Sequence, residues 1–199
     1  MEKGANKQNK QNQLVEKDNL LYILNSAIKA IDEMDIFTLK ELSNKTVHSA
    51  SIFQDTDSIS VAVIVYSLAK IYERSKYATY KDWKVFDKIV DLNLKNAIAN
   101  LKQNNTEAFT KNLADIINSI NGLSGHLRSY IEEVFRKARI NKASRLYEHG
   151  LSFEQTAKLL GISIFELAEY AGKTGIGDVD LGVTVPIKER IKIAMDFFK

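Results

Sequence analysis

Helix breakers are almost missing from the first 121 residues of this 199-residue chain. Apart from Gly4, no glycine or proline occurs before Gly122, and the single proline of the chain is Pro186. Leucine, isoleucine, alanine, lysine and glutamate are abundant, and most of these residues favour helices. A hydrophobic content of 45% is ordinary for a globular protein with a core. We therefore expect an all-α protein.

Apolar residues in the N-terminal part of the chain recur at helical spacing. The pattern predicts an N-terminal helical bundle of about five helices, four of which span residues 14–34, 59–74, 82–103 and 106–120. A capping box of Thr38 and Glu41 opens the helix that follows the first of these. The helix over 59–74 is apolar on nearly all sides, so we expect it at the centre of the bundle. Residues 1–13 are mostly Lys, Asn and Gln and predict a disordered tail. The expected organisation is a tail over 1–13, a bundle over 14–121 and a second module over 122–199.

Two helix starts are encoded eleven residues apart in the C-terminal part. Ser152 with Gln155, and Ser163 with Glu166, each match the capping-box pattern that begins a helix. Between them, Gly161 can adopt the positive φ that ends the first helix. The segment therefore predicts two short helices joined by a tight turn.

This segment resembles the DNA-binding helix-turn-helix superfamily. The superfamily has a small residue, a turn glycine four positions later and an aliphatic residue six beyond that, here Ala157, Gly161 and Leu167. The resemblance covers about residues 140–172, and a long helix predicted over 126–149 supplies the first of three helices. It implies a trihelical module and a transcriptional regulator that binds double-stranded DNA, which we expect to be a homodimer.

The resemblance also implies which side chains meet DNA. The candidates are the basic residues of the long helix, the start of the second short helix and one lysine after it: Arg136, Arg139, Lys142, Arg145, Ser163, Ile164, Phe165 and Lys173. Lys142 and Arg145 are the strongest candidates for phosphate contacts, although a solvated helix face explains the same charges. The second helix lacks the Arg, Lys, Asn and Gln that usually read base edges, so Ile164 and Phe165 also suit an anchor on another protein.

An alternating apolar stretch follows the motif. Residues 179–185 have a period of two, and Pro186 can start a last amphipathic helix, so we expect a short strand or extended arm. The arm could exchange across a homodimer, bind a partner protein or fold back on its own chain. A compact motif followed by an arm weakly resembles small prokaryotic antitoxins, which implies a protein-interaction adaptor as the alternative function.

The sequence gives no positive case for an enzyme, a cofactor or a metal site. Cysteine is absent, and His48, His126 and His149 do not have the H-x-x-x-H spacing of a helical metal site. Residues 171–175 match only the end of a phosphate-binding loop. The net charge is only +3, so a basic surface would need local segregation of charge. No apolar run reaches bilayer length, and we expect a cytoplasmic protein without membrane contact.

Overall fold

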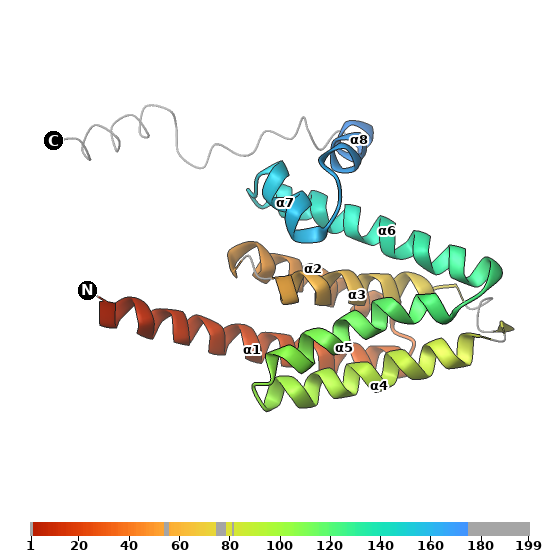
Figure 1. Cartoon of the computed structure of the whole chain (residues 1–199), viewed down its shortest axis with the longest axis horizontal. Helices are drawn as coiled ribbons and strands as arrows, with labels where there is room; N and C mark the ends of the chain where they lie inside the picture. Colours follow the sequence, from red (N-terminus) through yellow and green to blue (C-terminus); the bar gives the residue numbers. More distant parts are fainter. Residues whose placement is uncertain (1, 54–55, 75–78, 81, 175–199) are drawn as a thin grey trace.

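A computed structural model describes residues 2–53, 56–74, 79–80 and 82–174 (Figure 1). These residues form helices and their connections, with no strand among them. The helices are α1 (Glu2–Asp32), α2 (Ile36–Phe53), α3 (Thr56–Tyr72), α4 (Trp83–Lys102), α5 (Thr106–Asn118), the 3-10 helix η2 (Ser119–Gly122), α6 (Gly125–Glu148), α7 (Phe153–Leu160) and α8 (Ile164–Thr174). The predicted all-α class is confirmed for this part of the chain.

Helix α3 is the central helix of the structure, as its all-round apolar pattern predicts. It packs against α1, α2, α5, α6 and α7. Its side chains Ile64, Val65, Leu68 and Ile71 are fully buried. Full burial of such a side chain contributes about 1.5–3 kcal/mol, so α3 supplies much of the apolar burial that holds the other helices together.

The first helix begins earlier than its apolar stripe suggests. Residues 1–13 were expected to be a disordered tail, whereas α1 starts at Glu2. Lysine and glutamine are good helix formers, and no proline stops the helix from extending beyond the apolar stripe. None of the described helices is both long enough and apolar enough to cross a membrane.

The start of α2 differs from the predicted capping box at Thr38. Asp35 caps this helix instead: its Oδ1 accepts from the backbone N–H of Thr38 at 2.9 Å, and its Oδ2 accepts from the Thr38 hydroxyl at 2.6 Å. The prediction was wrong because an Asp three residues earlier offers a carboxylate to the same backbone group, and the helix starts at Ile36.

The chain turns through η2 where the boundary near residue 122 was expected, and Gly125 adopts a positive φ of 55° there. The hydrophobic core nevertheless continues across this turn. Phe135 of α6, Leu160 of α7 and Leu167 of α8 belong to the same core as the buried residues of the N-terminal helices. Helices α6 and α7 pack on α3, and α8 packs on α6 and α7 (Figure 1). The bundle therefore forms the base on which the C-terminal helices lie.

Candidate interaction surface on α6, α7 and α8

Both predicted capping boxes are confirmed. At the start of α7, the Ser152 hydroxyl accepts from the Gln155 N–H at 3.2 Å, and Gln155 Oε1 accepts from the Ser152 N–H at 3.2 Å. At α8, the Ser163 hydroxyl accepts from the Glu166 N–H at 3.1 Å, and Glu166 Oε2 accepts from the Ser163 N–H at 3.0 Å. The hydrogen bond from the Ser163 backbone, with that from its hydroxyl, lowers the pKa of Glu166. Each pair provides hydrogen-bond acceptors for two backbone N–H groups that the start of a helix would otherwise leave unsatisfied.

The turn between α7 and α8 also has the predicted geometry. Gly161 adopts φ 62° and ψ 37°, the left-handed conformation that only glycine adopts without strain. The N–H of Ile162 then donates to the Ala157 carbonyl at 3.1 Å, which closes the end of α7. Ala157 and Leu167 are buried where the two short helices meet the rest of the molecule. The two short helices and the glycine turn between them therefore follow from a few residues of sequence.

Lys142 is buried, contrary to the exposed position that its predicted role as a phosphate contact requires. The side chain is only 1% exposed. Its Nζ donates to Asn44 Oδ1 of α2 at 3.2 Å and lies 4.2 Å from the ring centroid of Tyr66 of α3. Burial lowers its pKa to about 8. The helical phase of buried Ile131, Phe135 and Ala138 continues to residue 142, and that phase would have placed Lys142 on the inner face of α6.

The exposed arginines of α6 already have carboxylate partners on the same helix. Arg136 donates to both oxygens of Glu133, at 2.9 and 3.0 Å, and Arg145 contacts Glu148 at 3.0 Å. The hydrogen bonds from Arg136, followed by that from Lys137, lower the pKa of Glu133 to about 2. Arg139 is half-buried and makes no ion pair with a described carboxylate. Arg136 and Arg145 therefore form mixed-charge pairs, which present less positive potential to a polyanion than isolated cations would.

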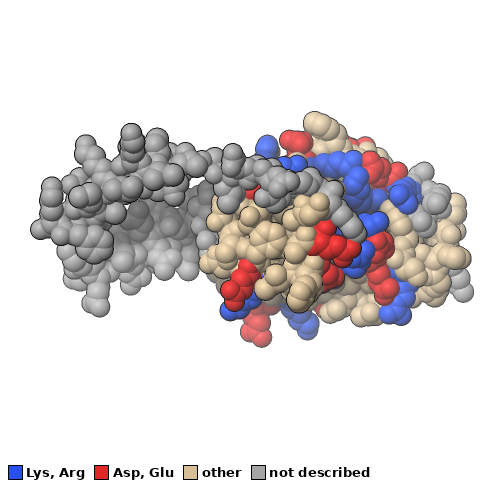
Figure 2. All heavy atoms as spheres, turned by 90° about the horizontal axis from the view of Figure 1, so that it is seen from above, with Lys and Arg blue, Asp and Glu red and all other residues tan. Residues whose placement is uncertain are grey.

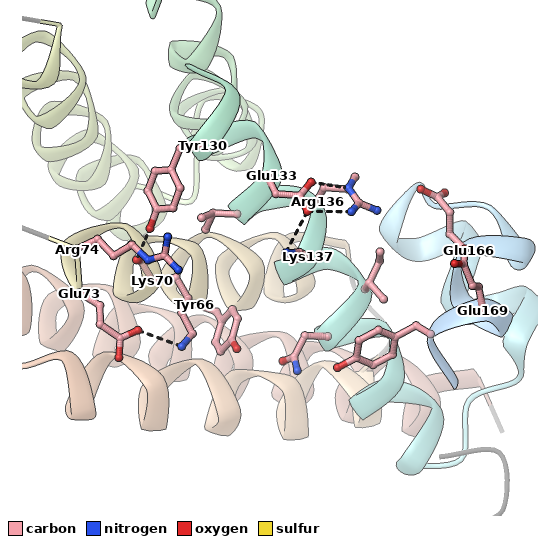
Figure 3. A pocket seen from close by; sticks show the side chains of 14 residues that line it. Tyr66, Lys70, Glu73, Arg74, Tyr130, Glu133, Arg136, Lys137, Glu166 and Glu169 are labelled. Atoms are coloured by element: carbon pink, nitrogen blue, oxygen red, sulfur yellow. Dashed lines mark hydrogen bonds and ion pairs between the residues drawn. The ribbon is translucent and has the colours of Figure 1, made fainter. Parts of the chain in front are cut away.

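A pocket of about 570 Å³ lies between α3, α6 and α8 (Figure 3). Four cations and four carboxylates line it, together with three tyrosine rings and a few smaller side chains. Glu166 and Glu169 project from α8 on the side that faces Arg136. The pKa of Arg136 is raised, first by Glu133 and then by these two carboxylates of α8. The predicted recognition helix thus places negative charge beside the arginines that were expected to contact phosphates.

Figure 2, which views the molecule from above the orientation of Figure 1, shows the same mixture over the face that carries α6, α7 and α8. On the visible part of this face, lysine and arginine side chains are interspersed with aspartate and glutamate side chains. A DNA-binding domain usually has a clustered basic patch or stripe. The pocket of mixed charge is lined by residues of α3, α6 and α8. These helices are separated in the sequence, so no local sequence pattern predicted the pocket.

The outer side of α8 carries the two apolar candidates. Phe165 is 86% exposed and Ile164 is 49% exposed. They are neighbours in the first turn of α8, where the Ser163–Glu166 capping box fixes the helix start. The hydroxyl of Ser163 bonds within that box, so Ser163 acts as a cap. The side chain of Lys173, the expected arm over 179–185 and the helix predicted from Pro186 lie outside the described residues.

Comparisons with family models, with curated proteins and with solved structures found no match to this chain. In the described residues, no group of three or more His, Asp or Glu side chains is placed to hold a metal ion. The geometry of α6, α7 and α8 is therefore the basis on which a function can be proposed.

Proposed function

We propose that the chain is a non-enzymatic interaction protein that uses its helix-turn-helix on a partner protein. The observation that carries the proposal is the exposure of Phe165 and Ile164 on a firmly capped helix. Large aromatic side chains that are held in place before binding are frequent anchors of protein interfaces, because little conformational entropy remains to be lost. Helix α8 packs on α6 and α7, and these two helices in turn pack on α3 of the bundle.

The same surface agrees less well with the DNA-binding regulator that the helix-turn-helix resemblance implies. Lys142 is buried, and Arg136 and Arg145 have carboxylate partners. Glu166 and Glu169 on α8 would face a polyanion. Each phosphate contact requires a protein cation that displaces counterions from the DNA. A carboxylate at the same place repels the phosphate and weakens binding. We therefore regard double-stranded DNA as the competing partner and a protein as the favoured one.

The acidic residues around the apolar pair indicate the chemistry of the partner's surface. Glu166 and Glu169 lie on α8, within one turn of the apolar pair along the same helix. A partner that matches this surface offers an apolar pocket for Phe165 with lysine or arginine at its rim. Charges of this kind at a rim act mainly on the rate and specificity of association, whereas the buried ring supplies most of the affinity.

The test uses the full chain in the cells that naturally make it. Wild type, Phe165→Glu and Phe37→Glu are compared by size-exclusion chromatography of gentle lysates. Phe37 is the matched control, since it is 75% exposed but belongs to α2. We expect wild type and Phe37→Glu to elute in a complex and Phe165→Glu to elute alone. The same size for all three, or a complex that nuclease disperses, would contradict the proposal.

A further inference from the structure

We propose that His48 and His149 form a zinc-binding pair that joins α2 to the corner between α6 and α7. The two residues are 101 positions apart in the sequence, yet their ring centroids lie 5.4 Å apart with an angle of 63° between the ring planes. His48 belongs to α2, and His149 is the C-cap residue of α6. The proposed site lies outside the Phe165 surface and does not depend on the proposed function.

The separation of the two rings fits two ligands of one tetrahedral ion. With a Zn–N bond of about 2.0 Å and a ring radius of about 1.1 Å, each centroid lies about 3.1 Å from the ion, so a tetrahedral angle places the centroids about 5 Å apart. A right angle, as in square-planar coordination, would place them about 4.4 Å apart. The observed 5.4 Å lies nearer the tetrahedral value. Imidazole is also a preferred ligand of zinc.

The surroundings of the pair allow an ion to reach it. Both histidines are exposed, so their rings can turn one nitrogen each toward a common point. The backbone at both positions is fixed: the His149 N–H donates to the carbonyls of Arg145 and Leu146, and His48 lies in the interior of α2. Two protein ligands leave the other positions of the ion to water, since no third described side chain joins the pair.

A bound ion would tie two parts of the chain that are otherwise joined through the core. The segment that follows His149 is the connection from Gly150 to Ser152, which starts α7. An ion held by both rings binds only when α2 and this corner are in their native places, so binding stabilises the folded chain. The site would thereby stabilise the placement of the helix-turn-helix on the bundle.

Isothermal titration with zinc chloride on the tag-free full chain tests the proposal, with His48→Ala, His149→Ala and His126→Ala variants. His126 is the third histidine of the chain and lies in the first turn of α6, so it serves as the matched control. We expect one zinc per chain in wild type and in His126→Ala. Loss of either paired histidine should weaken binding by at least about tenfold, since even an outer-shell partner of a metal ligand is worth that much.

Thermal unfolding gives a second measurement that does not depend on the heat of binding. Zinc should raise the unfolding midpoint for wild type and His126→Ala and leave it unchanged for His48→Ala and His149→Ala, and circular dichroism spectra of both variants serve as the control for folding. Absence of zinc binding to wild type, or binding that is unchanged in His48→Ala or in His149→Ala, would overturn the proposal.

Discussion

The burial of Lys142 leads to a sharp prediction about stability and pH. Lys142 is 1% exposed, its ammonium group has Asn44 and the ring of Tyr66 as neighbours, and burial lowers its pKa from 10.5 to about 8. Below pH 8 both folded and unfolded chains carry the proton, and the folded state bears the full cost of a buried charge. As the pH rises from 8 to 10.5, the folded chain loses the proton first, so its stability rises through this window.

The size of the effect follows from the two pKa values. A difference of 10.5 − 8 = 2.5 units corresponds to about 3 kcal/mol in total, of which about 2 kcal/mol is gained between about pH 7 and about pH 9.5. In Lys142→Met the side chain keeps most of its volume and loses the charge, so this gain should vanish. Other groups titrate in the same range, and the difference between wild type and variant removes their contribution.

The assay is urea unfolding followed by circular dichroism at the two pH values. Lys111→Met is the control, because Lys111 is an exposed lysine in the middle of α5. Wild type and Lys111→Met should each gain about 2 kcal/mol more than Lys142→Met on going to the higher pH. An equal change in all three chains would show that Lys142 is solvated, and would refute the account of α6 given above.

Three further substitutions test the C-terminal helices. Gly161→Ala should lower the free energy of unfolding by about 1 kcal/mol in urea titrations, because alanine is strained at a φ of 62° although its methyl group meets no atom within 4 Å; no loss would argue against this turn. Ser152→Ala should cost about 1 kcal/mol through loss of the α7 cap, and a value within error of zero would contradict the capping box. Phe165→Ala should change stability by less than about 0.5 kcal/mol, whereas Phe109→Ala, in the core, should cost about 3–5 kcal/mol. A large thermal shift for Phe165→Ala would mean that the ring supports the fold.

The parts of this molecule that the sequence predicts well are those that depend on neighbouring residues. The capping boxes at Ser152 and Ser163 and the glycine turn between them each act within a few positions, so the pattern alone located α7 and α8. The apolar run in α3 likewise marked it as the central helix. At Thr38 the capping-box pattern predicted the wrong helix start, because Asp35 accepts a hydrogen bond from the Thr38 backbone N–H.

The surface was harder to predict, because it depends on which helix faces lie together. Lys142 was assigned to solvent from its charge, yet its place in the helical repeat turns it toward α2 and α3. The carboxylates of α8 lie near enough to Arg136 of α6 to raise its pKa only after both helices have packed. The contact between His48 and His149 spans 101 residues of sequence, and no short spacing rule could reveal it.

The most direct test of the proposed function is a photo-cross-linkable phenylalanine analogue at position 165 of the full chain, in the cells that naturally make it. Position 37 carries the analogue in the control, since Phe37 is also well exposed. The account predicts a discrete adduct from position 165 that protease removes and nuclease leaves unchanged. Its mass identifies the partner, and twice the mass of the chain would identify a second copy. An adduct that nuclease removes would contradict the account and favour a DNA-binding regulator.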